Sequence, residues 1–224
     1  MNKFTFYLSG HNYEYEARNA LRVFDLNIDC EIKSTDETGF VFNEGAGLIS
    51  ILEENGPIAA GRAFLYFDGR LLYEAEYKSN EIFLECEDPK KLKKTLIVKS
   101  IHNVLKKYYK VTPDYGILTG VRVVKILVAA RKCGRTDEET DRILRDTYEV
   151  TDDKIKLLHD ILSIEENYIG DKNRKNYNLY LGIPFCPSKC SYCSFTSFTN
   201  CKDDKVNEYI KALVYETGET IKMA

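Results

Sequence analysis

The sequence lacks any large excess of charge of one sign. Its 224 residues contain 32 Lys and Arg against 35 Asp and Glu, so the formal net charge is −3. Nucleic-acid binders usually carry a strongly basic surface, and acidic tails carry blocks of negative charge, so this balance favours neither class. Nucleic acid is therefore not an expected partner.

Long apolar runs are also missing. No stretch approaches the roughly 20 apolar residues that a membrane-spanning helix needs. The opening residues, MNKFTFYLSGHNYEYEA, contain neither a long apolar segment nor the small-residue cleavage site of a secretory signal. With 44% hydrophobic residues the chain can nevertheless bury a core. We expect a folded, cytoplasmic protein with one large domain or two small ones.

The cysteine count is odd, at seven. In a reducing compartment such cysteines are thiols or metal ligands rather than a disulfide framework. Three of them are isolated in the sequence, namely Cys30, Cys86 and Cys133. We expect these three to be buried thiols that pack as small hydrophobic side chains.

The first half of the chain shows a mixture of strand and helix patterns. Residues 3–8 alternate as in a strand, and residues 12–24 place apolar side chains on one helical face. Several short strands are expected within residues 28–86. The dipeptide Asp68-Gly69 between two of them is typical of a type I′ hairpin turn, in which both central residues need positive φ.

Helix patterns follow. Residues 89–109 carry an apolar stripe behind a proline that suits a first helical turn, and a second helix is expected over 119–132. A third begins at Thr136, where Glu139 completes a capping box. A fourth is expected over 152–168, with acidic residues in its first turn.

These patterns predict two domains. Residues 1–169 form an α+β domain of short antiparallel strands plus helices, and the polar segment 170–178, GDKNRKNYN, is a linker. Residues 179–224 then read as a buried strand at 179–183, a cysteine-rich loop and an amphipathic helix at 204–222. Strand, loop and helix in that order open a parallel βα unit.

The loop places three cysteines close together in the string LGIPFCPSKCSYCSF: Cys186, Cys190 and Cys193. A structural zinc site closes its tetrahedron with four ligands. A 4Fe–4S cluster held by three thiolates leaves one iron open to a substrate or cofactor. We prefer the iron–sulfur interpretation, and a zinc site completed by Cys201 is the alternative.

The spacing Cys-x3-Cys-x2-Cys, with Tyr192 before the third cysteine, resembles the radical S-adenosylmethionine (radical SAM) superfamily. The longer string YLGIPFCPSKCSYCSF is similar to its coproporphyrinogen-dehydrogenase and heme-chaperone branch. The segment YGILTGVRVVK, residues 115–125, is similar to part of the HemZ-type proteins of that branch.

The resemblance implies a mechanism. The three cysteines would hold a 4Fe–4S cluster, and S-adenosylmethionine would chelate the fourth iron. An electron from the cluster, supplied by a flavodoxin- or ferredoxin-like donor, would cleave the cofactor to a 5′-deoxyadenosyl radical. In coproporphyrinogen dehydrogenases this radical takes a hydrogen atom from a propionate, which then loses carbon dioxide. The resemblance also implies cofactor-binding roles for Tyr180, Tyr192 and Phe195, although Tyr192 and Phe195 could equally be packing residues.

The sequence departs from the branch at two positions near the cysteines. Gly182 stands where the coproporphyrinogen dehydrogenases usually have a histidine, and Phe195 stands where they carry a fourth cysteine. The second departure is shared with heme-chaperone-like members. The alternative function is therefore a carrier or chaperone for heme without oxidase activity.

Residues 179–224 correspond to one βα unit, whereas a radical SAM barrel usually has six. We therefore expect this chain to be the first part of a truncated radical SAM α/β barrel protein, and to be inactive alone. S-adenosylmethionine is held by strand ends spread around such a barrel.

The segment 89–135 is locally basic. One interpretation is a site for an anionic partner, such as a propionate-rich tetrapyrrole or RNA, and the other is an ordinary solvated helix face. The histidines His11, His102 and His159 have no metal-ligand spacing, and His102 is expected at the boundary of the apolar stripe.

Overall fold

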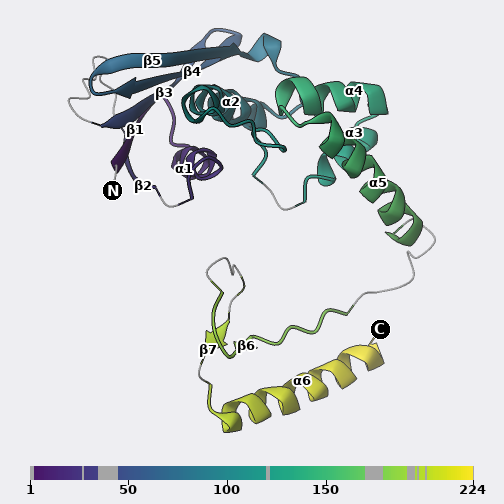
Figure 1. Cartoon of the computed structure of the whole chain (residues 1–224). Coiled ribbons are helices and arrows are strands. Elements are labelled where there is room, and N and C mark those ends of the chain that lie inside the picture. Colours follow the sequence, from purple (N-terminus) through teal and green to yellow (C-terminus); the bar gives the residue numbers. More distant parts are fainter. Residues whose placement is uncertain are drawn as a thin grey trace. The chain divides into compact units, whose positions relative to one another are not determined.

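The computed structural model of the chain describes residues 3–26, 28–34, 45–119, 122–169, 179–190, 195, 197–199 and 201–223. The chain divides into two units, Met1–Tyr168 and Ile169–Ala224 (Figure 1). Each is described by itself. The predicted linker, 170–178, lies outside the described residues, so the domain boundary stays a prediction.

A five-stranded sheet forms the base of the first unit. Its strands are β1 (Lys3–Ser9), β2 (Asp29–Ser34), β3 (Ala46–Asn55), β4 (Ile58–Phe67) and β5 (Arg70–Lys78), in the order β2-β1-β3-β4-β5. The expected α+β class is confirmed, but β1 runs parallel to both β2 and β3, and only β3, β4 and β5 pair antiparallel. The parallel pairing of β1 with β2 follows from the helix that connects them, because parallel neighbours need a crossover.

The β4–β5 hairpin closes through the predicted turn. Asp68 has φ 48° and Gly69 has φ 76°, so both central residues are in the left-handed region that a type I′ turn requires. The Asp68 carboxylate also accepts a hydrogen bond of 2.8 Å from the backbone N–H of Gly45. Asp68 therefore both adopts the left-handed backbone of the turn and hydrogen-bonds Gly45, the residue before β3.

Two helices, α1 (Glu14–Arg22) and α2 (Pro89–Tyr109), cover one face of the sheet (Figure 1). The predicted helix at 89–109 is confirmed, with Asp88 accepting hydrogen bonds from the first-turn N–H groups of Lys90 and Lys91. The core beneath these helices includes Phe4, Phe6, Leu8, Leu21, Leu48, Leu65, Ile97, Ile101 and Leu105. Gly61 lets α2 approach β4, since a Cβ there would lie 2.7 Å from the carbonyl carbon of Leu96.

A helical layer completes the first unit after the 3₁₀ turn η1 (Ser79–Glu81). It contains α3 (Lys125–Lys132), α4 (Asp137–Arg142), the π-helical turn η2 (Ile143–Thr147) and α5 (Asp152–Ile169). The predicted start of α3 at residue 119 is wrong. The helix begins only at Lys125, and the N–H groups of Lys125 and Ile126 bond to carbonyl oxygens three residues back, at 3.2 and 3.0 Å, as in a turn rather than an α-helix.

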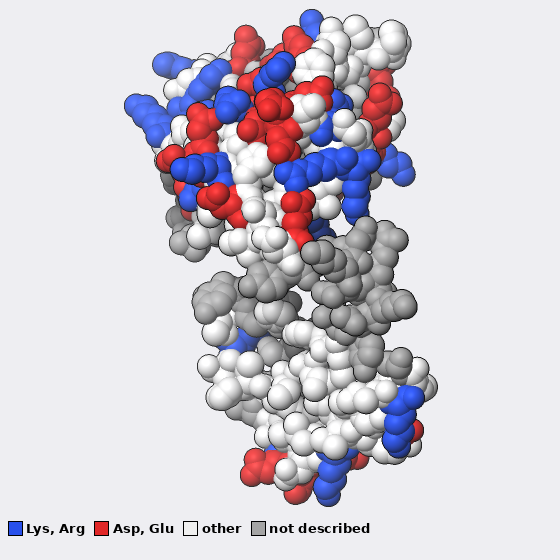
Figure 2. All heavy atoms as spheres, turned by 90° about the vertical axis from the view of Figure 1, so that its right-hand side faces the viewer, with Lys and Arg blue, Asp and Glu red and all other residues white. Residues whose placement is uncertain are grey.

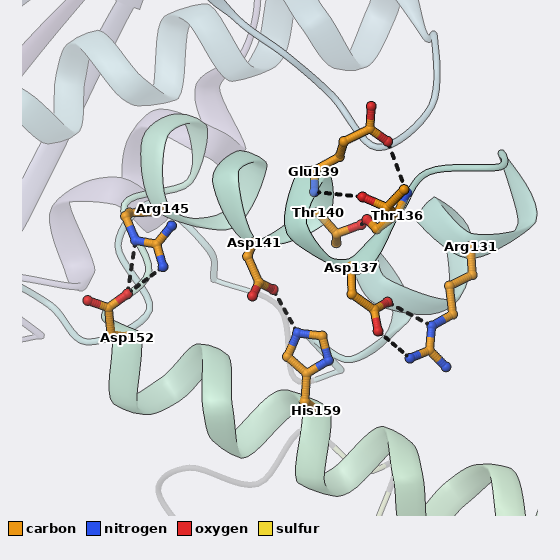
Figure 3. Close-up of polar contacts among 9 residues, drawn as sticks. All are labelled: Arg131, Thr136, Asp137, Glu139, Thr140, Asp141, Arg145, Asp152 and His159. Carbon is orange, nitrogen blue, oxygen red and sulfur yellow. Dashed lines mark hydrogen bonds and ion pairs between the residues drawn. The ribbon is translucent and has the colours of Figure 1, made fainter.

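The predicted capping box at the start of α4 is confirmed (Figure 3). Thr136 Oγ1 accepts from the N–H of Glu139 at 3.2 Å, and the Glu139 carboxylate accepts from the N–H of Thr136 at 2.9 Å. Arg131 grips Asp137 through two hydrogen bonds of 3.0 Å. The two Arg131–Asp137 bonds join the end of α3 to the start of α4.

A disulfide joins Cys86, which precedes α2, to Cys133, which follows α3. The expectation of buried thiols is therefore wrong for these two cysteines and confirmed for Cys30, which is free and buried. The two bonded residues are 47 positions apart, with Cα atoms separated by 5.9 Å. The same two segments are also joined by a hydrogen bond of 2.9 Å from Arg135 Nε to the Glu85 carbonyl oxygen.

The second unit contains the two-residue strands β6 (Phe185–Cys186) and β7 (Phe198–Thr199), and the helix α6 (Asp203–Met223). The predicted helix is confirmed, but the predicted strand at 179–183 is wrong: these residues have no regular structure. A strand forms only where a neighbour satisfies its backbone groups, and the described residues supply none here. Apolar side chains of α6 such as Val214 stay exposed. The barrel assignment stays a prediction.

Among the helices of the described ranges, none is long and apolar enough to cross a membrane.

Candidate functional site

The candidate site is the cysteine loop of the second unit, and its two ends are held together. β6 and β7 pair in parallel, with Phe185 opposite Phe198 and Cys186 opposite Thr199. The N–H of Phe198 also donates to the Pro184 carbonyl oxygen at 2.7 Å. The backbone therefore enters and leaves the loop at one place, and Cys186 is the last residue of the entering strand.

Helix α6 anchors the start of this loop. Tyr209 donates its hydroxyl proton to the Gly182 carbonyl oxygen at 2.6 Å. The ring of Phe185 lies edge-on to the Tyr209 ring at 5.1 Å and 6.5 Å from that of Phe198. Phe185 is thus a packing residue. Tyr209 is a positioning residue that the sequence did not single out, because its helical pattern shows an apolar face but not a partner for the hydroxyl.

The thiols of the loop are accessible. Cys186 and Cys190 are free and exposed, and Cys201 is free and half-buried. The third predicted ligand, Cys193, lies outside the described residues. In the part of the chain that the structure describes, no three His, Cys, Asp or Glu side chains form a group that could hold a metal. The zinc alternative, with Cys201 as the fourth ligand, is likewise not tested by the described residues.

The donor set fits an iron–sulfur cluster chemically. Thiolates are the protein ligands of such clusters, and neither Cys186 nor Cys190 is engaged in a disulfide. Ser197, directly before β7, has a buried hydroxyl oxygen with no hydrogen-bond partner among the described residues. A buried hydroxyl without a partner is costly, so a group bound in the loop would be stabilised by a hydrogen bond to it.

The residues predicted to bind the cofactor are Tyr180, Tyr192 and Phe195. Tyr180 is 85% exposed and Phe195 is 73% exposed, so neither side chain is packed in a core. Tyr192 lies outside the described residues. The cofactor-binding roles of these three residues remain predictions.

His102 was expected at the boundary of the apolar stripe, but the structure buries it fully. The ring centre of Phe24 lies 5.2 Å from that of His102. Burial lowers the pKa of His102 to about 4, although Glu149 is 3.7 Å from its Nδ1. The histidine is therefore neutral at pH 7. His159 instead contacts Asp141 at 2.7 Å on the surface of the helical layer (Figure 3).

Much of the basic segment 89–135 is engaged in ion pairs. Lys91 binds Glu85, Lys93 binds Glu54 and Lys94 binds Glu16, each partner coming from a different element. Acidic and basic side chains are interspersed on the face of the first unit that Figure 2 shows. A mixed surface of this kind does not favour RNA as a partner.

Similarity to known proteins covers part of the chain. No protein-family model matches the chain, and no solved structure matches it. Among curated proteins, the chain is similar to the oxygen-independent coproporphyrinogen-III oxidase-like protein HemZ of Bacillus subtilis (strain 168), with 35% identity over 92 residues. These residues are 40% of this chain and 18% of HemZ, so the match spans less than a fifth of that relative. Over the matched part the chain is similar to this HemZ-type protein, which agrees with the resemblance of its motifs.

Proposed function

We propose that this chain is part of a radical SAM protein in which Cys186, Cys190 and Cys193 hold a 4Fe–4S cluster. The observation that carries the proposal is the spacing of these cysteines in a relative of HemZ. Two of them are free, exposed thiols on one short loop. When bound, the cluster supplies one-electron reduction of S-adenosylmethionine, with the electron coming from a flavodoxin- or ferredoxin-like donor.

The residues of this chain would position that cluster. The β6–β7 pair closes the loop, and the Tyr209 hydroxyl holds the backbone four residues before Cys186. A loop that is fixed at both ends would lose less conformational entropy when its thiols bind a metal. The unpartnered Ser197 hydroxyl would then find an acceptor or a donor in the assembled site.

The proposed reaction of the whole protein is oxidative decarboxylation of coproporphyrinogen III, by analogy with the name of the curated relative. One observation favours a second candidate, a heme carrier or chaperone: Phe195 occupies the position of the fourth cysteine of the dehydrogenases. Both functions would use the same three cysteines. Product analysis distinguishes them, because only the oxidase makes vinyl-bearing porphyrin products.

We further propose that the 224 residues alone do not complete this reaction. Cys186 and Cys190 are exposed, as are Tyr180 and Phe195 beside them in the sequence. Radical chemistry needs an enclosed site that excludes water. A reactive species formed on so open a loop would meet solvent before substrate.

Anaerobic reconstitution with iron and sulfide tests the proposed cluster. The wild-type chain should develop the broad visible absorbance of an iron–sulfur cluster, and Cys190→Ala should not. Cys30→Ala is the matched control, because Cys30 is a free but buried thiol in the other unit. Equal loss of absorbance in both variants would contradict the proposed ligands.

A further inference from the structure

The first unit contains a cleft of about 920 Å³ that has no role in the proposed function. The cleft is lined by five segments that lie far apart in the sequence: the β1–α1 connection with part of α1, the end of β3, the start of α2 with Asp88, residues 117–119, and Tyr148. This volume is in the range of sites for small organic molecules, which hold roughly 300–1,000 Å³.

The cleft lies at the carboxyl ends of two parallel strands, β1 and β3, which are neighbours in the sheet. From these ends the chain departs in opposite directions, β1 through α1 to β2, and β3 by a hairpin to β4. Connections that diverge in this way open a crevice between them, and ligands of α/β sheets commonly bind in such crevices.

The connection after β1 has a fixed shape. Gly10 has φ 72°, and a Cβ there would come within 2.2 Å of the Leu52 carbonyl oxygen, so only glycine fits. Next to it, burial lowers the pKa of His11 to about 4, which leaves the ring neutral. Its Nδ1 accepts from the Tyr13 N–H at 3.2 Å, so its Nε2 carries the proton and donates to Ser50 Oγ at 3.0 Å. This wall of the cleft is therefore preformed.

The floor of the cleft is apolar. It is made by Leu52, Val98, Ile117 and Tyr148, each less than a tenth exposed. At the mouth, Tyr15 is 73% exposed, so one large aromatic ring is available to stack on a ligand. An apolar floor with an aromatic ring at its edge suits a flat hydrocarbon body.

The rim carries an excess of positive charge. Four lysines of α2 line the cleft, Lys90, Lys91, Lys93 and Lys94, against the three carboxylates Glu16, Glu54 and Asp88. The Asp88 carboxylate is already occupied by backbone N–H groups of α2.

One of these lysines is free, and a second is held by a single exposed carboxylate, whose two oxygens lie 2.8 and 2.7 Å from its ammonium. Among the described residues, no carboxylate lies within 4 Å of the Lys90 ammonium, which is therefore free. Lys93 pairs with Glu54 at 2.7 Å, but that carboxylate is 53% exposed, and ion pairs in such positions are weak and exchange readily.

We propose that this cleft binds an organic anion with a flat apolar body and a carboxylate group. The body would lie on Leu52, Val98 and Ile117 against Tyr15, and the carboxylate would meet Lys90 and Lys93. No described residue of the cysteine loop lines this cleft, so the proposal does not require a cluster. The basic stretch of α2 thus has a ligand-binding role in addition to its surface ion pairs.

Nuclear magnetic resonance of the full chain tests the proposal, with naphthoate as the probe and naphthalenemethanol as its neutral analogue. Naphthoate should shift the backbone amide signals of Gly10, Leu118 and Thr119 in a saturable manner. The neutral analogue should bind at least about fivefold more weakly, because it lacks the charge that the lysines attract.

Two double variants that remove the same charge test whether Lys90 and Lys93 bind the carboxylate. Lys90→Gln with Lys93→Gln should weaken naphthoate binding by about fivefold and leave the neutral analogue unaffected. The control is Lys107→Gln with Lys132→Gln, which removes the same charge from exposed positions outside the cleft and should not change the affinity. Equal binding of the two probes, an equal effect of the two double variants, or saturable shifts confined to the second unit would overturn the proposal.

Discussion

The Cys86–Cys133 disulfide makes the stability of the first unit depend on redox conditions. The perturbation is either a reductant or the double substitution Cys86→Ser with Cys133→Ser. The bond joins residues 47 positions apart, so in the unfolded chain it closes a loop of that length. The chain-entropy relation gives about 4 kcal/mol for such a loop, and strain or residual structure in the unfolded state lowers that figure.

The assay is thermal unfolding followed by circular dichroism, with and without reductant. At roughly 2–4 °C per kcal/mol for a domain of this size, the full entropic effect corresponds to a fall in Tm of about 8–16 °C on reduction. The Cys86→Ser/Cys133→Ser variant should unfold at the temperature of the reduced wild type and should not respond to reductant. Cys30→Ser should retain the response, because its thiol is free.

Alkylation of the unfolded chain provides an independent count. The sequence has seven cysteines, and two in a disulfide leave five that can be alkylated before reduction. Seven alkylated cysteines without reductant, together with a Tm that reductant does not change, would refute the structural role assigned to this bond.

Two further substitutions test the packing described above. Tyr209→Phe removes a hydrogen bond worth about 1 kcal/mol from the loop, so amide hydrogen exchange around Cys186 should accelerate about fivefold, whereas Tyr215→Phe on an exposed position of α6 should have no effect. Gly61→Ala places a methyl group against the backbone of α2 and should destabilise the first unit by about 1–3 kcal/mol in urea unfolding, whereas Gly218→Ala, with nothing within 4 Å, should not; equal effects would contradict the close approach of α2 to β4.

Local signals in the sequence predicted local structure well. The Asp68-Gly69 turn, the Thr136 capping box and the helix from Pro89 each depend on residues within a few positions of one another. Their chemistry is therefore visible in the sequence. The α+β class followed from the same signals.

Long-range pairing could not be read in this way. Nothing near Cys86 indicates Cys133 as its partner, and the alternating pattern of residues 3–8 does not say that β1 has parallel neighbours. The apolar run 179–183 looks like a buried strand, but a strand also needs a neighbour, which the pattern alone cannot supply. His102 was placed one position from the apolar stripe, and only the packing of Phe24 against it explains its burial.

In the candidate site too, local features could be predicted from the sequence and long-range contacts could not. The cysteine spacing predicts the metal chemistry, since it lies within eight residues, and similarity to HemZ supports the family. The anchoring role of Tyr209 depends on a contact across 27 positions and emerged only from the structure. The lysine-rimmed cleft likewise gathers residues from five separate segments.

Native mass spectrometry of the anaerobically reconstituted chain tests the central claim most directly. The account predicts an added mass of four irons and four sulfides on the wild-type chain. That mass should be lost in Cys193→Ala and retained in Cys201→Ala, because only the first is a proposed ligand. A single bound zinc that requires Cys201, or a cluster that survives the loss of Cys193, would contradict it.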